Sequence, residues 1–290
     1  MTIYQNPSIE PDEVPIAMKE AFRCFNDAFD TEYSEDNVKI AYCTFETFPQ
    51  VYEDFCSKCF PSWLAEDYMN PAFYMDTNAS ALVEGENSGI IINTSVPFPF
   101  FEWVNSLTHE LAHVYATRNE YHGQSFYEKH CCDPSLSAEE DMIYIGYQVW
   151  KEFIADYLTA YARPYMVPMT LYQLRSQIKQ FDSVIRDLKP TSLKAITLVL
   201  VGIFTSREFL TSRDKEAFLS LLKEKKVVDT EEYKGLIRTV IDHLCREDIE
   251  PFCINEWFMD DIGNQVRSLV TGKQCQILTG KRKNQGILEL

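Results

Sequence analysis

The sequence predicts an α+β fold, with a small mixed sheet and a central helix followed by a mostly helical C-terminal region. The three segments whose composition predicts strands all precede residue 94. From residue 100 onward the apolar residues recur at helical spacing. The chain has 290 residues, of which 46% are hydrophobic, so it can bury a sizeable core without disulfides. This order of elements is typical of the α+β class.

The first third of the chain mixes helices and strands. Apolar spacing predicts a helix over Glu13–Phe29, and a shorter helix over Phe48–Phe60 is followed by helix-breaking prolines. Three segments have the composition of strands: Val38–Phe45, Ser80–Val83 and Gly89–Asn93. The polar turn at 84–88 separates the last two, so the sequence predicts a hairpin there.

The rest of the chain is predicted to be helical. Three helices are expected after the strands: Phe100–Asn119, Gln124–Cys131 and Ala138–Ala162. Five more follow Pro168: Leu171–Leu188, Leu193–Phe209, Asp214–Lys225, Thr230–Cys245 and Glu256–Val270. We therefore expect one domain over residues 1–165 and a helical region over 166–290, packed on or next to it.

Charge and composition narrow the classes of function. The net charge of −17 argues against nucleic acid and anionic membrane surfaces as partners. The first fifteen residues lack the pattern of a secretory signal, and the apolar run Ala195–Phe204 is too short to span a bilayer. The nine cysteines do not have the density of a disulfide framework. We expect a protein of the reducing cytoplasm.

An H-E-x-x-H motif lies inside the predicted helix Phe100–Asn119. Its histidines, His109 and His113, are four residues apart, which places them on one helix face about 5–6 Å apart. Two imidazoles at that spacing can bind one Zn2+ ion. Glu110 points about a quarter turn away, so it can act as a general base without binding the ion.

A catalytic zinc ion needs a third protein ligand, and two residues are candidates. Glu152 lies four residues before Asp156, so one carboxylate can bind the metal while the other accepts a hydrogen bond from a ligand histidine. His122 follows the motif helix closely and could also turn back toward the ion. The sequence favours Glu152 because it comes with a supporting carboxylate.

The H-E-x-x-H helix followed by a helix with E-x-x-x-D resembles the gluzincin metallopeptidases, the thermolysin-like clan. The resemblance covers roughly residues 89–162. It implies a zincin-like core, with His109, His113 and Glu152 as zinc ligands. It also implies Glu110 as the base and Asp156 as the partner of a ligand histidine.

The resemblance has three further implications. The strand Gly89–Asn93 would line the cleft as a sheet edge with which substrate pairs. A downstream tyrosine or histidine would stabilise the transition state, and the candidates are His122, Tyr147 and Tyr157. The string around His122 is also similar to the SprT-like proteases, in which such a histidine is the third ligand.

The expected function is zinc-dependent hydrolysis of peptide bonds in a peptide or protein substrate. Three alternatives remain open: a zinc-containing regulatory or binding module without turnover, a non-peptide amide hydrolase and a SprT-like protease. The C-terminal helices are a candidate surface for a protein partner. A second string, Cys56-Ser57-Lys58-Cys59, is weak as a redox or metal motif because no second pair accompanies it.

Overall fold

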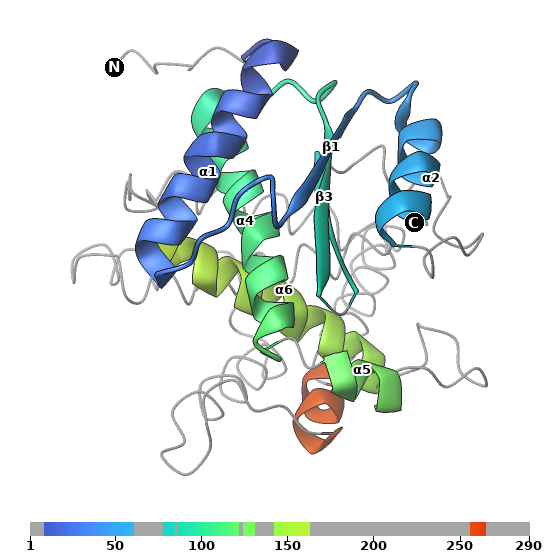
Figure 1. Cartoon of the computed structure of the whole chain (residues 1–290). Helices are drawn as coiled ribbons and strands as arrows, with labels where there is room; N and C mark the ends of the chain where they lie inside the picture. Colours follow the sequence, from blue (N-terminus) through green and yellow to red (C-terminus); the bar gives the residue numbers. More distant parts are fainter. Residues whose placement is uncertain are drawn as a thin grey trace, which may run out of the picture. The chain divides into compact units, whose positions relative to one another are not determined.

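The computed structural model of the chain describes residues 9–60, 78–84, 86–121, 124–130, 142–162 and 256–264 (Figure 1). The chain divides into two compact units, Met1–Asn119 with Ile154–Met166, and Glu120–Phe153 with Val167–Leu290. The helices predicted between Leu171 and Cys245 lie outside the described residues. So does the predicted domain boundary at 165/166, which stays a prediction.

The first unit contains a three-stranded mixed sheet. Its strands are β1 (Lys39–Cys43), β2 (Ala79–Glu84) and β3 (Asn87–Asn93), in the spatial order β1-β3-β2. β1 runs parallel to β3, and β2 pairs with β3 antiparallel. All three predicted strands are present and the last two form the predicted hairpin, so the α+β class with a small mixed sheet is confirmed.

The position of β3 corrects one expectation. The segment Gly89–Asn93 was expected at an edge of the sheet, but β3 is paired on both sides and lies in the middle. The reason is visible in its composition: three successive isoleucines, Ile90 to Ile92, are all buried. Consecutive apolar residues point to opposite faces of a strand, so such a run suits a strand covered on both faces. Among the described strands, β1 and β2 form the edges.

Helices cover both faces of this sheet. Helix α2 (Phe48–Cys59) lies on one face, and α1 (Val14–Phe29) and α4 (Phe100–Arg118) lie on the other (Figure 1). The face toward α2 and the α2 segment together form an apolar cluster of seven buried residues: Cys43, Phe48, Tyr52, Cys56, Phe60, Leu82 and Ile91. The three helices match the predicted ranges to within one residue at each end, because their apolar spacing is a local signal.

Helix α1 packs against α4 (Figure 1). Its buried side chains recur every three to four residues, and the rings of Phe25 and Phe29 lie 5.6 Å and 5.1 Å from the ring of Tyr115 on α4. The helix ends at Asp30, whose φ of 51° is left-handed. A left-handed residue is a common helix stop, although glycine adopts it more readily than aspartate.

Arg118 ties the C-terminal end of α4 to the sheet. Its guanidinium donates hydrogen bonds to Ser88 Oγ and to the carbonyl of Asn37, each at 3.0 Å, and lies over the ring of Tyr33. Just before the start of β2, the side-chain amide of Asn78 donates a hydrogen bond to Ser106 Oγ on α4. Helix α4, which carries the H-E-x-x-H motif, is thus fixed along its length.

The second unit contains α5 (Gln124–His130), the first half of α6 (Met142–Ala162) and a helix over 256–264. The last two are in backbone contact: a Cβ on Gly146 would lie 1.9 Å from the Met259 carbonyl oxygen, and one on Gly263 would lie 1.9 Å from that of Met142. Only glycine permits so close an approach. None of the described helices has the length and apolar character needed to cross a membrane.

Candidate metal centre

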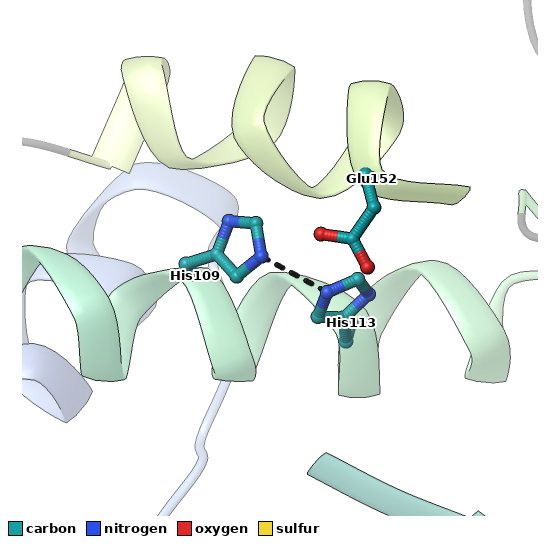
Figure 2. A group of neighbouring side chains, drawn as sticks. All are labelled: His109, His113 and Glu152. Carbon is teal, nitrogen blue, oxygen red and sulfur yellow. Dashed lines mark hydrogen bonds between the residues drawn. The ribbon is translucent and has the colours of Figure 1, made fainter. Parts of the chain in front are cut away.

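The two motif histidines lie together on α4, as their spacing predicts. The distance between His109 Nε2 and His113 Nε2 is 3.0 Å, and the ring planes are nearly perpendicular at 87° (Figure 2). Two nitrogens bound to one tetrahedral zinc ion at 2.0–2.1 Å would be about 3.3 Å apart. The two imidazoles therefore need to separate by only a few tenths of an ångström to hold an ion between them.

Glu152 on α6 completes a group of three. One ligand atom from each of His109, His113 and Glu152 lies within 4.8 Å of the other two. Figure 2 shows the Glu152 carboxylate pointing from α6 toward the imidazoles on α4. These three residues form a group that could hold a metal ion. The division into units crosses α6 between Phe153 and Ile154, within one uninterrupted helix.

The donor set fits a transition metal. Among the described residues the group supplies two imidazole nitrogens and one carboxylate oxygen, the three-ligand arrangement of catalytic zinc sites. The same donors also bind other divalent first-row metals, so the residues fix the class of ion and leave its identity open. Glu152 and His109 are partly buried and His113 is only 8% exposed, so an ion here would be shielded in part from solvent.

Asp156 lies one turn beyond Glu152 on α6 and contacts His109 from the far side of its ring. The distance from His109 Nδ1 to Asp156 Oδ1 is 2.8 Å. When Nδ1 donates its proton to this carboxylate, Nε2 keeps its lone pair toward the other ligands. Such a carboxylate orients a metal-binding histidine and makes it more basic.

Glu110 directly follows His109 in α4 and does not belong to the group of three. The residue is only 8% exposed, and its Oε2 accepts a hydrogen bond of 2.7 Å from the backbone amide of Ala81 on β2. A buried carboxylate needs such donors because desolvation of an unpaired charge is costly. The hydrogen bond from Ala81 was not predictable from sequence, because a backbone donor has no characteristic side chain.

The three candidates for a transition-state stabiliser lie in different surroundings. Tyr147 is buried beside Tyr127 and Phe126, with ring centroids 5.1 Å and 6.4 Å away. The Tyr157 hydroxyl lies 3.1 Å from that of Tyr161 in an exposed pair on α6. His122 lies outside the described residues. The metal-binding group found among the described residues contains Glu152 as its third member.

The C-x-x-C string of α2 has a different setting. Both Cys56 and Cys59 are free thiols, and Cys56 is fully buried in the apolar cluster beneath α2. Burial raises the pKa of the Cys56 thiol, against a smaller opposite effect of the hydrogen bond from Tyr52. A thiol held protonated is a poor nucleophile and a poor metal ligand. The described residues therefore support a packing role for Cys56.

No protein-family model, curated protein or solved structure matches this chain. The interpretation of the site consequently rests on its own chemistry: the donor set, the distances and the supporting carboxylates.

Proposed function

We propose that the chain is a zinc-dependent metallopeptidase of the gluzincin type, with a zincin-like core. The observation that carries the proposal is the convergence of His109, His113 and Glu152, with Asp156 bonded to the first of them. A buried carboxylate, Glu110, directly follows His109 in the helix that carries both histidines. A purely structural zinc site would use four protein ligands, and the group among the described residues has three.

The residues of the chain would divide the work as follows. His109, His113 and Glu152 would hold the ion. When bound, zinc supplies a Lewis acid that polarises a carbonyl and lowers the pKa of water toward about 7. Asp156 keeps the His109 ring in the orientation that directs Nε2 toward the ion.

Glu110 is the proposed general base. Its carboxylate would accept the proton that water loses on attacking the peptide carbonyl, and would then deliver it to the leaving amine. A general base of this kind contributes about 10²–10⁴-fold to the rate. Because Glu110 does not bind the ion, its loss should leave the affinity for zinc intact. A binding module without turnover would have no chemical use for this carboxylate.

The proposed substrate is an extended peptide, and β2 is the edge next to the base. In the antiparallel pair with β3, Ala81 lies opposite Ile90, and its amide points away from β3 toward Glu110. The outer edge of β2 therefore faces the carboxylate. An extended peptide can add to such an edge through main-chain groups other than the Ala81 amide, which Glu110 occupies.

The test is hydrolysis of an unstructured protein by purified wild type and by Glu110→Gln, each with and without a chelator. We expect activity only in the metal-loaded wild type, and equal zinc content in the two proteins. Full activity of Glu110→Gln would refute the assignment of the base. A wild type that binds zinc tightly and cleaves no polypeptide would instead favour a regulatory module or a non-peptide amide hydrolase.

A further inference from the structure

The proposed general base has a fixed partner on the sheet. The amide of Ala81 donates to Glu110 Oε2 at 2.7 Å, between a backbone group of β2 and a side chain of α4. The distance is at the short end for a hydrogen bond from nitrogen to oxygen, as expected when the acceptor is charged. The contact joins residues 29 apart in the chain, so it depends on how β2 lies against α4.

The register of the sheet explains why this amide is available. The Asn93 amide donates to the Asn78 carbonyl, which marks Asn78 and Asn93 as a pair at a hydrogen-bonded position of the ladder. In an antiparallel ladder such pairs alternate with pairs that do not bond to each other. Ala81 and Ile90 lie three positions further along the ladder, so they form a pair that does not exchange hydrogen bonds. The amide of Ala81 therefore points away from β3, toward the outer side of the edge strand. It can serve Glu110 without weakening the β2–β3 ladder.

The hydrogen bond from Ala81 restricts the orientation of the Glu110 carboxylate, and a general base needs a fixed orientation. The terminal torsion of a glutamate side chain is broad, so a free carboxylate samples many orientations. An amide bound to Oε2 restricts this torsion and selects one orientation of the carboxylate. The amide belongs to a strand in the sheet, so it moves far less than a side-chain donor would.

We propose that the backbone amide of Ala81 is the positioning group for Glu110, so that the edge strand orients the general base. The inference rests on the proposed function as far as catalysis is concerned, while the hydrogen bond itself can be tested without any activity. A general base must lie within hydrogen-bond reach of the proton that it accepts, and displacement by about 1 Å can cost a hundredfold in rate. The role of Ala81 is therefore expected in kcat and not in metal binding.

The first experiment measures amide hydrogen exchange in protein labelled with [15N]alanine. We expect the Ala81 amide to exchange about 10–100-fold more slowly in wild type than in Glu110→Ala, because the hydrogen bond to the charged carboxylate must open before the amide exchanges. Ala79 has the same label and the same outward orientation on β2, and its rate should change much less. Equal exchange of Ala81 in the two proteins would overturn the inference, whatever the activity of the wild type.

The second experiment removes the amide by Ala81→Pro. Proline is tolerated on an edge strand where the lost N–H points off the sheet, so the ladder should survive. We expect kcat to fall by about 10–100-fold with KM and zinc affinity near wild-type values. The conservative variant Ala81→Val keeps the amide and should recover most of that loss.

Val83→Pro is the matched control, because it removes the next outward amide of the same strand. Its kcat should stay within a few-fold of wild type. Equal losses in Ala81→Pro and Val83→Pro would show that proline itself damages the strand, and would overturn a specific role for Ala81. If Ala81→Pro fails to fold, the exchange experiment decides. An inactive wild type would refute the peptidase while the exchange rates still report whether Ala81 holds the carboxylate.

Discussion

Two helices of the first unit carry pairs of potential metal ligands at helical spacing, and the pairs differ sharply in their surroundings. On α4, His109 and His113 are four residues apart, and on α2, Cys56 and Cys59 are three apart. The histidines meet a carboxylate from α6 within 4.8 Å. Cys56 instead lies under α2 among apolar side chains.

The difference shows that spacing alone does not make a site. Both pairs could bind an ion by their own geometry, but only the histidine pair has partners that fix a tautomer and supply further ligands. Burial without such partners raises the pKa of Cys56 and keeps the thiol protonated. The chemistry of the α4 pair therefore depends on α6, and the following predictions test that dependence.

The largest effect is expected for loss of a ligand. His113→Ala should reduce zinc affinity by much more than the roughly 10–100-fold typical of losing a supporting carboxylate. Competition against a chromophoric chelator would measure it. Cys59→Ala is the matched control on α2 and should leave zinc affinity unchanged. Loss of zinc from the cysteine variant would mean that the ion binds at α2.

Removal of the carboxylate behind His109 should have the next largest effect. We expect Asp156→Ala to weaken zinc binding by about 10–100-fold while the ligands themselves stay in place. Glu20→Gln removes an ion-paired carboxylate from α1, bonded to Arg23, and should not change the affinity. An affinity for zinc that is the same in Asp156→Ala as in wild type would rule out the supporting role.

Two glycines, Gly146 on α6 and Gly89 on β3, allow the packing around α6 to be compared with the packing around α2. A Cβ at Gly146 on α6 would meet the Met259 backbone at 1.9 Å, whereas one at Gly89 would meet the Phe55 ring of α2 at 2.6 Å. A backbone cannot move aside as a ring can. We expect Gly146→Ala to cost about 1–3 kcal/mol of unfolding free energy, despite the gain of about 1 kcal/mol in helix propensity. Urea unfolding should show a smaller cost for Gly89→Ala.

The smallest effect concerns alkaline pH and the core beneath α2. Burial raises the pKa of the Cys43 thiol from 9.0 to about 11. Between these values the unfolded chain loses the proton first, so stability should be complete below pH 9 and fall as pH rises toward 11. The slope from this thiol is at most about 1.4 kcal/mol per pH unit. Urea unfolding at several pH values should give a shallower decline for Cys43→Ala, and an equal decline would contradict the assignment.

The elements were predictable where their signals are local. Helices α1, α2 and α4 and the hairpin follow from apolar spacing and a polar turn. The order of the strands was not predictable in this way, because pairing depends on contacts between distant segments. The run Ile90 to Ile92 did contain the clue, since apolar side chains on both faces suit a central strand.

In the candidate site too, the residues with a local signal were predictable, and the contact between distant segments was not. His109, His113, Glu152 and Asp156 could be proposed from sequence because spacing of four residues puts each pair on one helix face. The amide of Ala81 could not, because any residue carries one and only the register of β2 directs it toward Glu110. Peptidase activity and the identity of the metal remain proposals for the experiments above.

The central position of β3 also affects the risk of aggregation while the chain is being synthesised. A stretch such as Ile90-Ile91-Ile92, with high β propensity and no charge, promotes aggregation when it is exposed. Both strands that pair with β3 precede it in the sequence, so they have already left the ribosome when the isoleucines emerge. The segment of the sheet most prone to aggregation is thus synthesised after both strands that pair with it, so only the face toward α4 waits for a later segment.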